Sequence, residues 1–231
     1  RWRSLLVTGA LGIGLMAVLM ALGVDKSSAT EGSIVVGLEP IGVAMAGVVL
    51  AGDRVAPRTV VALLLGCCGT VISAGLVTLP ASSAPFLPTL ALVGTVATFS
   101  VYTARVRRAS QGVDPLAVAA ITQVGALAFG LLAVPLDVAD EGAVRPGVDG
   151  SSILAVLFLG LGSALAYLLL CLVLSRMPTG RVAVSLYLIP LIGVLVAWLV
   201  VGEPLHLRHV IGGALVLVGV ALNEGVAAGR S

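Results

Sequence analysis

Charged side chains are scarce in this chain of 231 residues. Asp, Glu, Lys and Arg together account for 10% of the sequence, whereas 59% of the residues are hydrophobic. A soluble domain of this length could not bury so much apolar surface, so lipid must cover a large part of it. The formal net charge of +2 gives no support for nucleic acid as a partner. The composition therefore predicts a protein of the lipid bilayer.

Residues that could form disulfides, bind metals or carry out catalysis are also few. The three cysteines, Cys67, Cys68 and Cys171, all lie in apolar runs, where cysteine serves as a small packing residue. The sequence contains neither Gly-x-Gly-Asp nor His-Glu-x-x-His, and no pair of acids deep in an apolar run. An intramembrane enzyme would need such a constellation. We therefore expect no enzyme, no metal site and no cofactor.

Apolar runs of about twenty residues recur along the chain, and each is long enough to cross roughly 30 Å of hydrocarbon. The short segments between them carry nearly all of the charge. The pattern predicts an all-α polytopic membrane protein with eight transmembrane helices. The predicted spans are Leu5–Val24, Gly32–Ala51, Val60–Leu79, Phe86–Ala104, Pro115–Val134, Ile153–Leu174, Val182–Val201 and Leu205–Leu222.

The positions of the basic residues predict the orientation of these spans. If the N-terminus is cytoplasmic, ten of the 13 Lys and Arg residues lie on the cytoplasmic side, and only Lys26, Arg145 and Arg208 lie outside. Cytoplasmic loops of membrane proteins carry an excess of Lys and Arg. We therefore expect a multi-pass protein of the cytoplasmic membrane, with both termini of the chain in the cytoplasm.

The first third of the chain resembles its last third. Residues 4–73 align without a gap with residues 154–223, at an offset of 150 residues. A duplicated apolar block within one polytopic chain is typical of transporters built from two halves. The aligned pairs include Gly12 with Gly162, Pro40 with Pro190, Gly52 with Gly202, and Asp53 with Glu203.

Two predicted spans, Phe86–Ala104 and Pro115–Val134, precede the second copy and have no counterpart before the first. A complete unit would then hold five helices, and because five is odd, two such units cross the bilayer in opposite directions. We expect residues 1–80 to be the last three helices of one unit and residues 81–231 to be a complete second unit. The first residue is Arg1 rather than methionine, so we expect a fragment or processed form lacking the first two helices of a ten-helix inverted repeat.

Short motifs in both copies carry a resemblance to a known family. The second copy contains LYLIP at residues 186–190, GEPL at 202–205 and GGALVLVG at 212–219. The first copy contains LEP at residues 38–40 and GDR at 52–54. In this order the motifs resemble paired EamA-like domains of the drug/metabolite transporter superfamily. The resemblance implies ten helices in a complete member and the import or export of small metabolites.

Glu39 is an ionisable residue near the middle of a predicted span, where an acid costs roughly 2.5–3.5 kcal/mol. Such a residue usually faces a polar cavity and binds a cation or a proton, although packing against a loosened backbone is the alternative. Pro40 and Pro190 lie at equivalent depths in the two copies, and each frees a backbone carbonyl four residues earlier. Two such kinks indicate either a site between the repeats or bends that serve packing alone.

Four further polar residues are candidates for contacts with a substrate. Tyr187 lies beside the second kink, and its hydroxyl can face either a substrate or the protein interior. Ser100 and Tyr102 lie in one unpaired span and Gln123 lies in the other. In a polar pore these groups would orient a substrate, whereas in a packed bundle they would form interhelical hydrogen bonds worth about 0.6 kcal/mol each.

The equivalent pairs Gly52–Asp53 and Gly202–Glu203 each end one predicted span and lead into the next. A glycine with positive φ followed by an acid near a helix N-terminus suits a tight turn, so we expect a structural role. Arg58 follows Asp53 by five residues and is a candidate partner for its carboxylate.

The absence of Lys and Arg deep in any predicted span indicates the class of solute. A carrier of phosphorylated sugars or nucleotide sugars would be expected to place a cation there. The sequence favours a secondary transporter of neutral, zwitterionic or cationic solutes, such as amino acids or drug-like compounds, working by alternating access and either proton-coupled or facilitative. A non-transporting remnant or an assembly partner is the main alternative, and the sequence leaves open whether the chain is a monomer or a homodimer.

Overall fold

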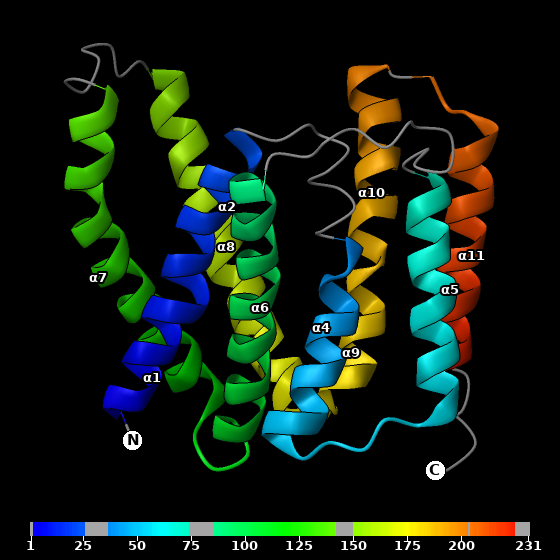
Figure 1. Cartoon of the computed structure of the whole chain (residues 1–231), viewed down its shortest axis with the longest axis horizontal. Coiled ribbons are helices and arrows are strands. Elements are labelled where there is room, and N and C mark those ends of the chain that lie inside the picture. Colours follow the sequence, from blue (N-terminus) through cyan, green and yellow to red (C-terminus); the bar gives the residue numbers. More distant parts are fainter. Residues whose placement is uncertain (1, 26–36, 74–85, 142–149, 203, 225–231) are drawn as a thin grey trace.

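The computed structural model describes residues 2–25, 37–73, 86–141, 150–202 and 204–224 (Figure 1). Within these ranges all regular secondary structure is helical, and no strand occurs. The predicted all-α class is therefore confirmed. Among the described residues, five helices are long and apolar enough to cross a membrane, and three shorter apolar helices accompany them.

The long helices include continuous runs of several elements. They are α1 (Trp2–Gly9) with η1 (Ala10–Gly14) and α2 (Leu15–Asp25), α6 (Phe86–Ala109), α7 (Pro115–Glu141), α8 (Gly150–Arg176), and α9 (Thr179–Leu186) with α10 (Leu188–Val196) and η4 (Ala197–Val201). The shorter ones are α4 (Glu39–Ala46) with η2 (Gly47–Ala51), α5 (Pro57–Ser73) and α11 (Leu207–Glu224).

Several helix limits differ from the predicted spans. Helix α7 continues past Val134 to Glu141. The predicted span ended where the apolar residues end, but backbone hydrogen bonds of a helix can continue through polar residues. Helix α5 begins three residues before Val60, at Pro57, since proline is well tolerated at the first position of a helix. Residues 32–36 and 74–79 of two predicted spans lie outside the described residues.

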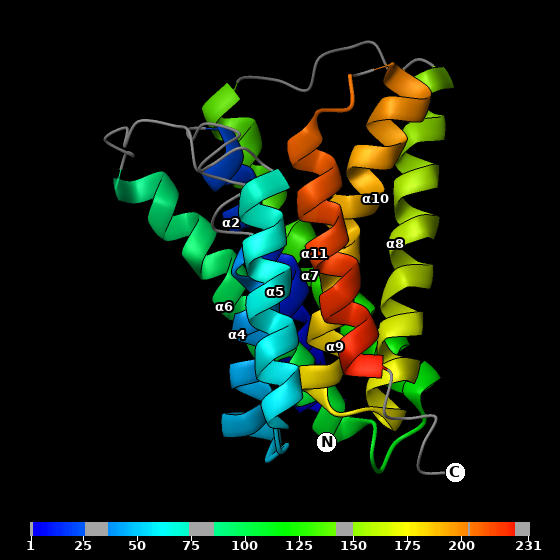
Figure 2. The ribbon, with the colours of Figure 1, turned by 90° about the vertical axis from the view of Figure 1, so that its right-hand side faces the viewer.

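The helices run side by side along one direction, so the bundle has two ends (Figures 1 and 2). Helix α1 begins and α11 finishes at the same end, which we call the base (Figure 1). Helices α6 and α7 pack on α1 and α2 at one side of the bundle, and α5 packs along α11 at the other. Between these groups, α4 contacts both α6 and α9.

The segments α4–η2 and α10–η4 both end in a π-helical turn followed by a glycine. The π-helical turns η2 and η4 lie 150 residues apart, and each is followed by a glycine in the left-handed region, with φ of 74° at Gly52 and 78° at Gly202. A side chain at either glycine would be strained, which explains why glycine is needed there. The chain leaves η2 at the base and leaves η4 at the opposite end (Figure 1).

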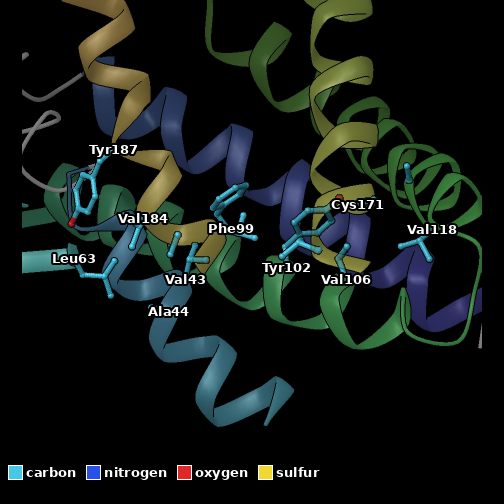
Figure 3. Close-up of a cluster of buried hydrophobic side chains, with 14 of the residues drawn as sticks. Val43, Ala44, Leu63, Phe99, Tyr102, Val106, Val118, Cys171, Val184 and Tyr187 are labelled. Atoms are coloured by element: carbon cyan, nitrogen blue, oxygen red, sulfur yellow. The ribbon is translucent and has the colours of Figure 1, made fainter. Parts of the chain in front are cut away.

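Buried apolar side chains join the central helices (Figure 3). Val43 of α4, Leu63 of α5 and Val184 of α9 belong to one cluster. The glycine Gly66 allows α5 to approach α9, because a Cβ there would lie 2.2 Å from the ring of Tyr187. The cluster includes buried residues of α1, α4, α5, α6, α7, α8, α9 and α11.

Candidate functional site

A cavity of about 410 Å³ lies among helices α4, α5, α9, α10 and α11. Its volume is within the range that is usual for small-molecule sites. The lining residues come from both copies of the repeated sequence. They are Gly37, Glu39, Pro40, Thr70, Ser73, Leu186, Tyr187, Ile189, Pro190, Val194, Arg208 and His209.

Glu39 reaches the cavity because the helix breaks immediately before it. Leu38 forms a turn, so Glu39 becomes the first residue of α4, and Pro40 becomes the second. A carboxylate is favourable at a helix N-terminus, where backbone N–H groups lack partners. Glu39 is half-buried and Pro40 is buried. The sequence pattern Glu-Pro within an apolar run thus places an acid at a helix start inside the bundle.

A second break lies at the same cavity. Tyr187 separates α9 from α10, and its N–H donates to the carbonyl of Val184 at 3.2 Å instead of continuing the α-helical pattern. Pro190 follows three residues later and cannot donate a hydrogen bond. The structure therefore brings together four of the predicted site residues, Glu39, Pro40, Tyr187 and Pro190.

Two buried hydroxyl groups at the cavity lack a hydrogen bond within the described residues. Thr70 is 8% exposed and Tyr187 is 1% exposed, yet neither Oγ1 of Thr70 nor Oη of Tyr187 has a partner of normal geometry. The thiol of Cys67 neighbours the Tyr187 hydroxyl, but a thiol is a weak hydrogen-bonding group. A buried hydroxyl without a partner costs free energy, so these groups are suited to a polar ligand.

Thr70 and Ser73 were not among the predicted site residues. They lie three positions apart on α5 and therefore share a helix face. That spacing of two hydroxyl residues near the end of a span was the available signal in the sequence.

The other three candidates, Ser100, Tyr102 and Gln123, do not line this cavity. Ser100 is buried beside α4, where a Cβ on Gly42 would lie 2.6 Å from its Oγ. The hydroxyl of Tyr102 lies 3.3 Å from that of Thr122 on α7, and its ring meets the ring of Tyr167 on α8 edge to face at 5.7 Å. Gln123 is half-buried on α7.

The turn after Gly52 makes a contact that the sequence did not suggest. The carboxylate of Asp53 accepts hydrogen bonds from Thr179 at the start of α9, and its ion-pair partner is Arg107 rather than Arg58. The local spacing suggested Arg58, but the tertiary fold brings α9 and α6 to this position. The equivalent acid Glu203 lies outside the described residues.

Arg208 and His209 line the cavity from the first turn of α11. The Nε of Arg208 donates to Nε2 of His209 at 3.4 Å, and the His209 ring lies 5.5 Å from that of His206. The cavity therefore has an acid at the start of α4 and a base at the start of α11. A zwitterionic solute would find a complementary group there for each of its charges.

Comparison with known proteins gives consistent matches of three kinds. The model of the EamA-like transporter family matches residues 1–75 and 87–224. A curated protein of Archaeoglobus fulgidus, described as an uncharacterized transporter, is 27% identical over 225 residues, which cover 95% of this chain and 78% of the relative. A solved structure titled only as the crystal structure of a protein superposes with a TM-score of 0.81 at 24% identity, covering 94% of this chain and 76% of the other.

The solved structure supports the fold alone, whereas the family match and the curated relative indicate a transporter and not an enzyme. The several apolar helices agree with a multi-pass membrane location. Because the family model matches nearly the whole chain, the protein belongs to the EamA-like transporter family.

Proposed function

We propose that this protein is a secondary transporter that moves small neutral, zwitterionic or cationic solutes across the cytoplasmic membrane by alternating access. The observation that carries the proposal is the cavity that holds Glu39 between segments of the two sequence copies. An acid within a membrane-spanning bundle is costly unless it binds a cation or a proton. Glu39 is accordingly the site for proton coupling or for a cationic group of the solute.

The composition of the cavity supports this class of solute. Glu39 supplies a negative charge, and Thr70 and Tyr187 supply hydroxyl groups that still have hydrogen bonds to make. Arg208 at the start of α11 suits a carboxylate on the same solute. The remaining surface includes Leu186, Ile189 and Val194, which suit an apolar side chain.

We propose further that the bundle is an inverted repeat of two units, residues 1–80 and 81–231. Each unit contains a segment that ends in a π-helical turn and a left-handed glycine, at positions 150 residues apart. These segments leave the bundle at opposite ends (Figure 1), as two inverted units require. The start of α1 at Trp2 and the end of α11 at Glu224 then lie on the cytoplasmic side.

The surface of α8 supports a ten-helix form of this arrangement. Helix α8 occupies the place in the second unit that Trp2–Asp25 occupies in the first. A Cβ on Gly12 would lie 2.5 Å from Cβ of Tyr102, whereas one on the equivalent Gly162 would meet nothing within 4 Å. All described side chains from Ile153 to Ala166 are exposed. Two helices equivalent to α6 and α7 would cover this surface of α8.

Transport by the reconstituted chain tests the proposed function. Proteoliposomes with an imposed pH gradient would be supplied with labelled amino acids and labelled organic cations. We expect the wild type to move at least one of these solutes, and Glu39→Gln to abolish the part of the movement that the gradient drives. Removing the carboxylate removes the proton site while nearly preserving the volume of the side chain.

Asp114→Asn is the matched control for this experiment. Asp114 is an exposed acid whose Oδ1 accepts from the N–H of Leu116 at 3.3 Å, and it does not line the cavity. Its substitution should leave coupling unchanged. Unaltered coupling in Glu39→Gln would remove Glu39 from the mechanism, and a wild type that moves none of these solutes would contradict the transport proposal.

A further inference from the structure

Asp53 connects two parts of the chain that are far apart in sequence. It follows Gly52 at the end of η2, and its Oδ2 accepts a hydrogen bond from the backbone N–H of Thr179 at 2.6 Å. The hydroxyl of Thr179 donates to the same oxygen. Thr179 is the first residue of α9 and is fully buried. The first unit therefore caps a helix of the second unit.

Arg107 of α6 completes the contact. Its Nη1 donates to the carbonyl oxygens of Leu174 at 2.8 Å and Ser175 at 3.3 Å, in the last turn of α8. Its Nε lies 3.6 Å from Oδ1 of Asp53. One guanidinium thus binds the end of α8 and faces the carboxylate that binds the start of α9.

The two charges match the helix ends that they meet. A helix has a partial positive charge at its N-terminus and a partial negative charge at its C-terminus. The carboxylate of Asp53 meets the N-terminus of α9, and the guanidinium of Arg107 meets the C-terminus of α8. Their side chains are 8% and 14% exposed, so water screens this pair less than a surface pair.

The base holds further contacts near Asp53, Thr179 and Arg107. A Cβ on Gly47 would lie 2.5 Å from Cβ of Thr179, so η2 and α9 have no space between them here. Thr59 of α5 donates to Oδ1 of Asn223 at 3.1 Å, and Nδ2 of Asn223 donates to the carbonyl of Arg181 at 3.2 Å. The Gly47–Thr179 packing and the Thr59–Asn223 hydrogen bond each join residues 1–80 to residues 81–231, whereas the Asn223–Arg181 bond lies within the second range. The cavity is lined by Glu39 at the start of α4. Helix α4 begins farther from the base than η2 ends (Figure 1).

We propose that Asp53, Thr179 and Arg107 form a gate that closes the base of the bundle and must separate before the cavity can be reached from that side. The inference rests on the proposed function, because alternating access of two units requires the contacts between them at one end to break. Helix capping alone would stabilise the protein without affecting which side of the cavity is accessible. The two roles therefore differ in a measurable way.

The test uses a single cysteine placed between the gate and the cavity. Val184 is 1% exposed and lies beside Val43 and Leu63 (Figure 3), so Val184→Cys provides a buried thiol of similar size. The three native cysteines would be replaced by alanine in the full chain. Membrane vesicles of both orientations would then be treated with a membrane-impermeant thiol reagent. The readout is the rate of labelling from each side.

Two substitutions separate the charge from the cap. Asp53→Ala removes both the ion pair and the acceptor for Thr179, whereas Asp53→Asn keeps an acceptor and removes the charge. We expect the labelling rate from the base side to rise at least tenfold in Asp53→Ala and less in Asp53→Asn. Thr179→Val should raise it, and Thr179→Ser, which retains the hydroxyl, should not. Labelling from the opposite side should fall in the variants that open the base.

Asp114→Ala is the matched control, because Asp114 caps α7 within the second unit alone. It should leave labelling from both sides at the wild-type rate. Equal labelling in all the variants, or labelling that rises from both sides together, would overturn the gate. The gate is also overturned if every variant at Asp53 and Thr179 loses its fold while Asp114→Ala keeps it, since the contact is then structural. Solute movement would be measured in parallel. If Asp53→Ala opens the base while the wild type moves no solute, the transport proposal is refuted and the gate stands.

Discussion

At the scale of single residues, the sequence identified site residues of types that are rare within a membrane span. It did not identify site residues of types that are common there. Glu39 was noticed because acids are rare at that depth, and Pro40 and Pro190 because prolines break helices. Thr70 was not, because a threonine in a span usually bonds to its own helix, as Thr103 does to the carbonyl of Phe99 at 2.8 Å. Thr70 has no such partner among the described residues, and only the structure shows the difference.

The two unpaired hydroxyls give a prediction at this scale. Thr70→Val and Tyr187→Phe each remove a hydroxyl from the cavity with little change of shape. If each hydroxyl bonds to the solute, we expect the KM for transport to rise about fivefold, since a neutral hydrogen bond contributes about 1 kcal/mol. Thr103→Val removes an equally buried hydroxyl that is already bonded, so its KM should match the wild type. An equal effect of all three substitutions would indicate general loss of packing.

At the scale of elements, the apolar runs of the sequence predicted the positions of the helices well. The residues at which the helices end depend on local hydrogen bonding, which the apolar runs do not show. The break at Leu38 lies next to the predicted kink at Pro40, and the break at Tyr187 lies three residues before Pro190. The π-helical turns at Gly47–Ala51 and Ala197–Val201 were not expected, because no residue type specifies them. The extension of α7 to Glu141 was also not predicted. The predicted span ended with the apolar run, whereas the helix continues into the charged residues that follow it.

Helix packing gives a prediction at this scale. Helices α5 and α11 approach closely at Gly69 and Gly212, where a Cβ on Gly69 would lie 2.5 Å from the carbonyl oxygen of Gly212. Gly69→Ala must push the two backbones apart, so we expect a loss of about 1–3 kcal/mol of stability. Thermal unfolding in detergent measures this as a lower midpoint.

Gly130→Ala provides the comparison, because a Cβ there meets nothing within 4 Å. Alanine favours helix over glycine, so this variant should unfold at or above the wild-type midpoint. Similar midpoints for Gly69→Ala and Gly130→Ala would contradict the close approach of α5 and α11.

At the scale of the whole molecule, the orientation predicted from the basic residues stays a prediction, and the contacts between distant segments could not be predicted. Counting Lys and Arg gave an orientation that requires the chain to leave η2 and η4 at opposite ends, which is how the two turns are placed (Figure 1). Local spacing paired Asp53 with Arg58, whereas its partners are Arg107 and Thr179. Such long-range pairs depend on how whole helices pack, and the spacing of residues in the sequence does not predict that packing.

The sidedness of the two glycine turns is the most direct test of this arrangement. Single cysteines at the exposed positions Arg54 and Leu205, in a background without native cysteines, would be labelled by an impermeant thiol reagent in vesicles of known orientation. Two inverted units require a cysteine at Arg54 to react from the cytoplasmic face and one at Leu205 from the external face. Reaction of both cysteines from the same face would contradict the inverted arrangement and, with it, the transporter mechanism proposed for the cavity.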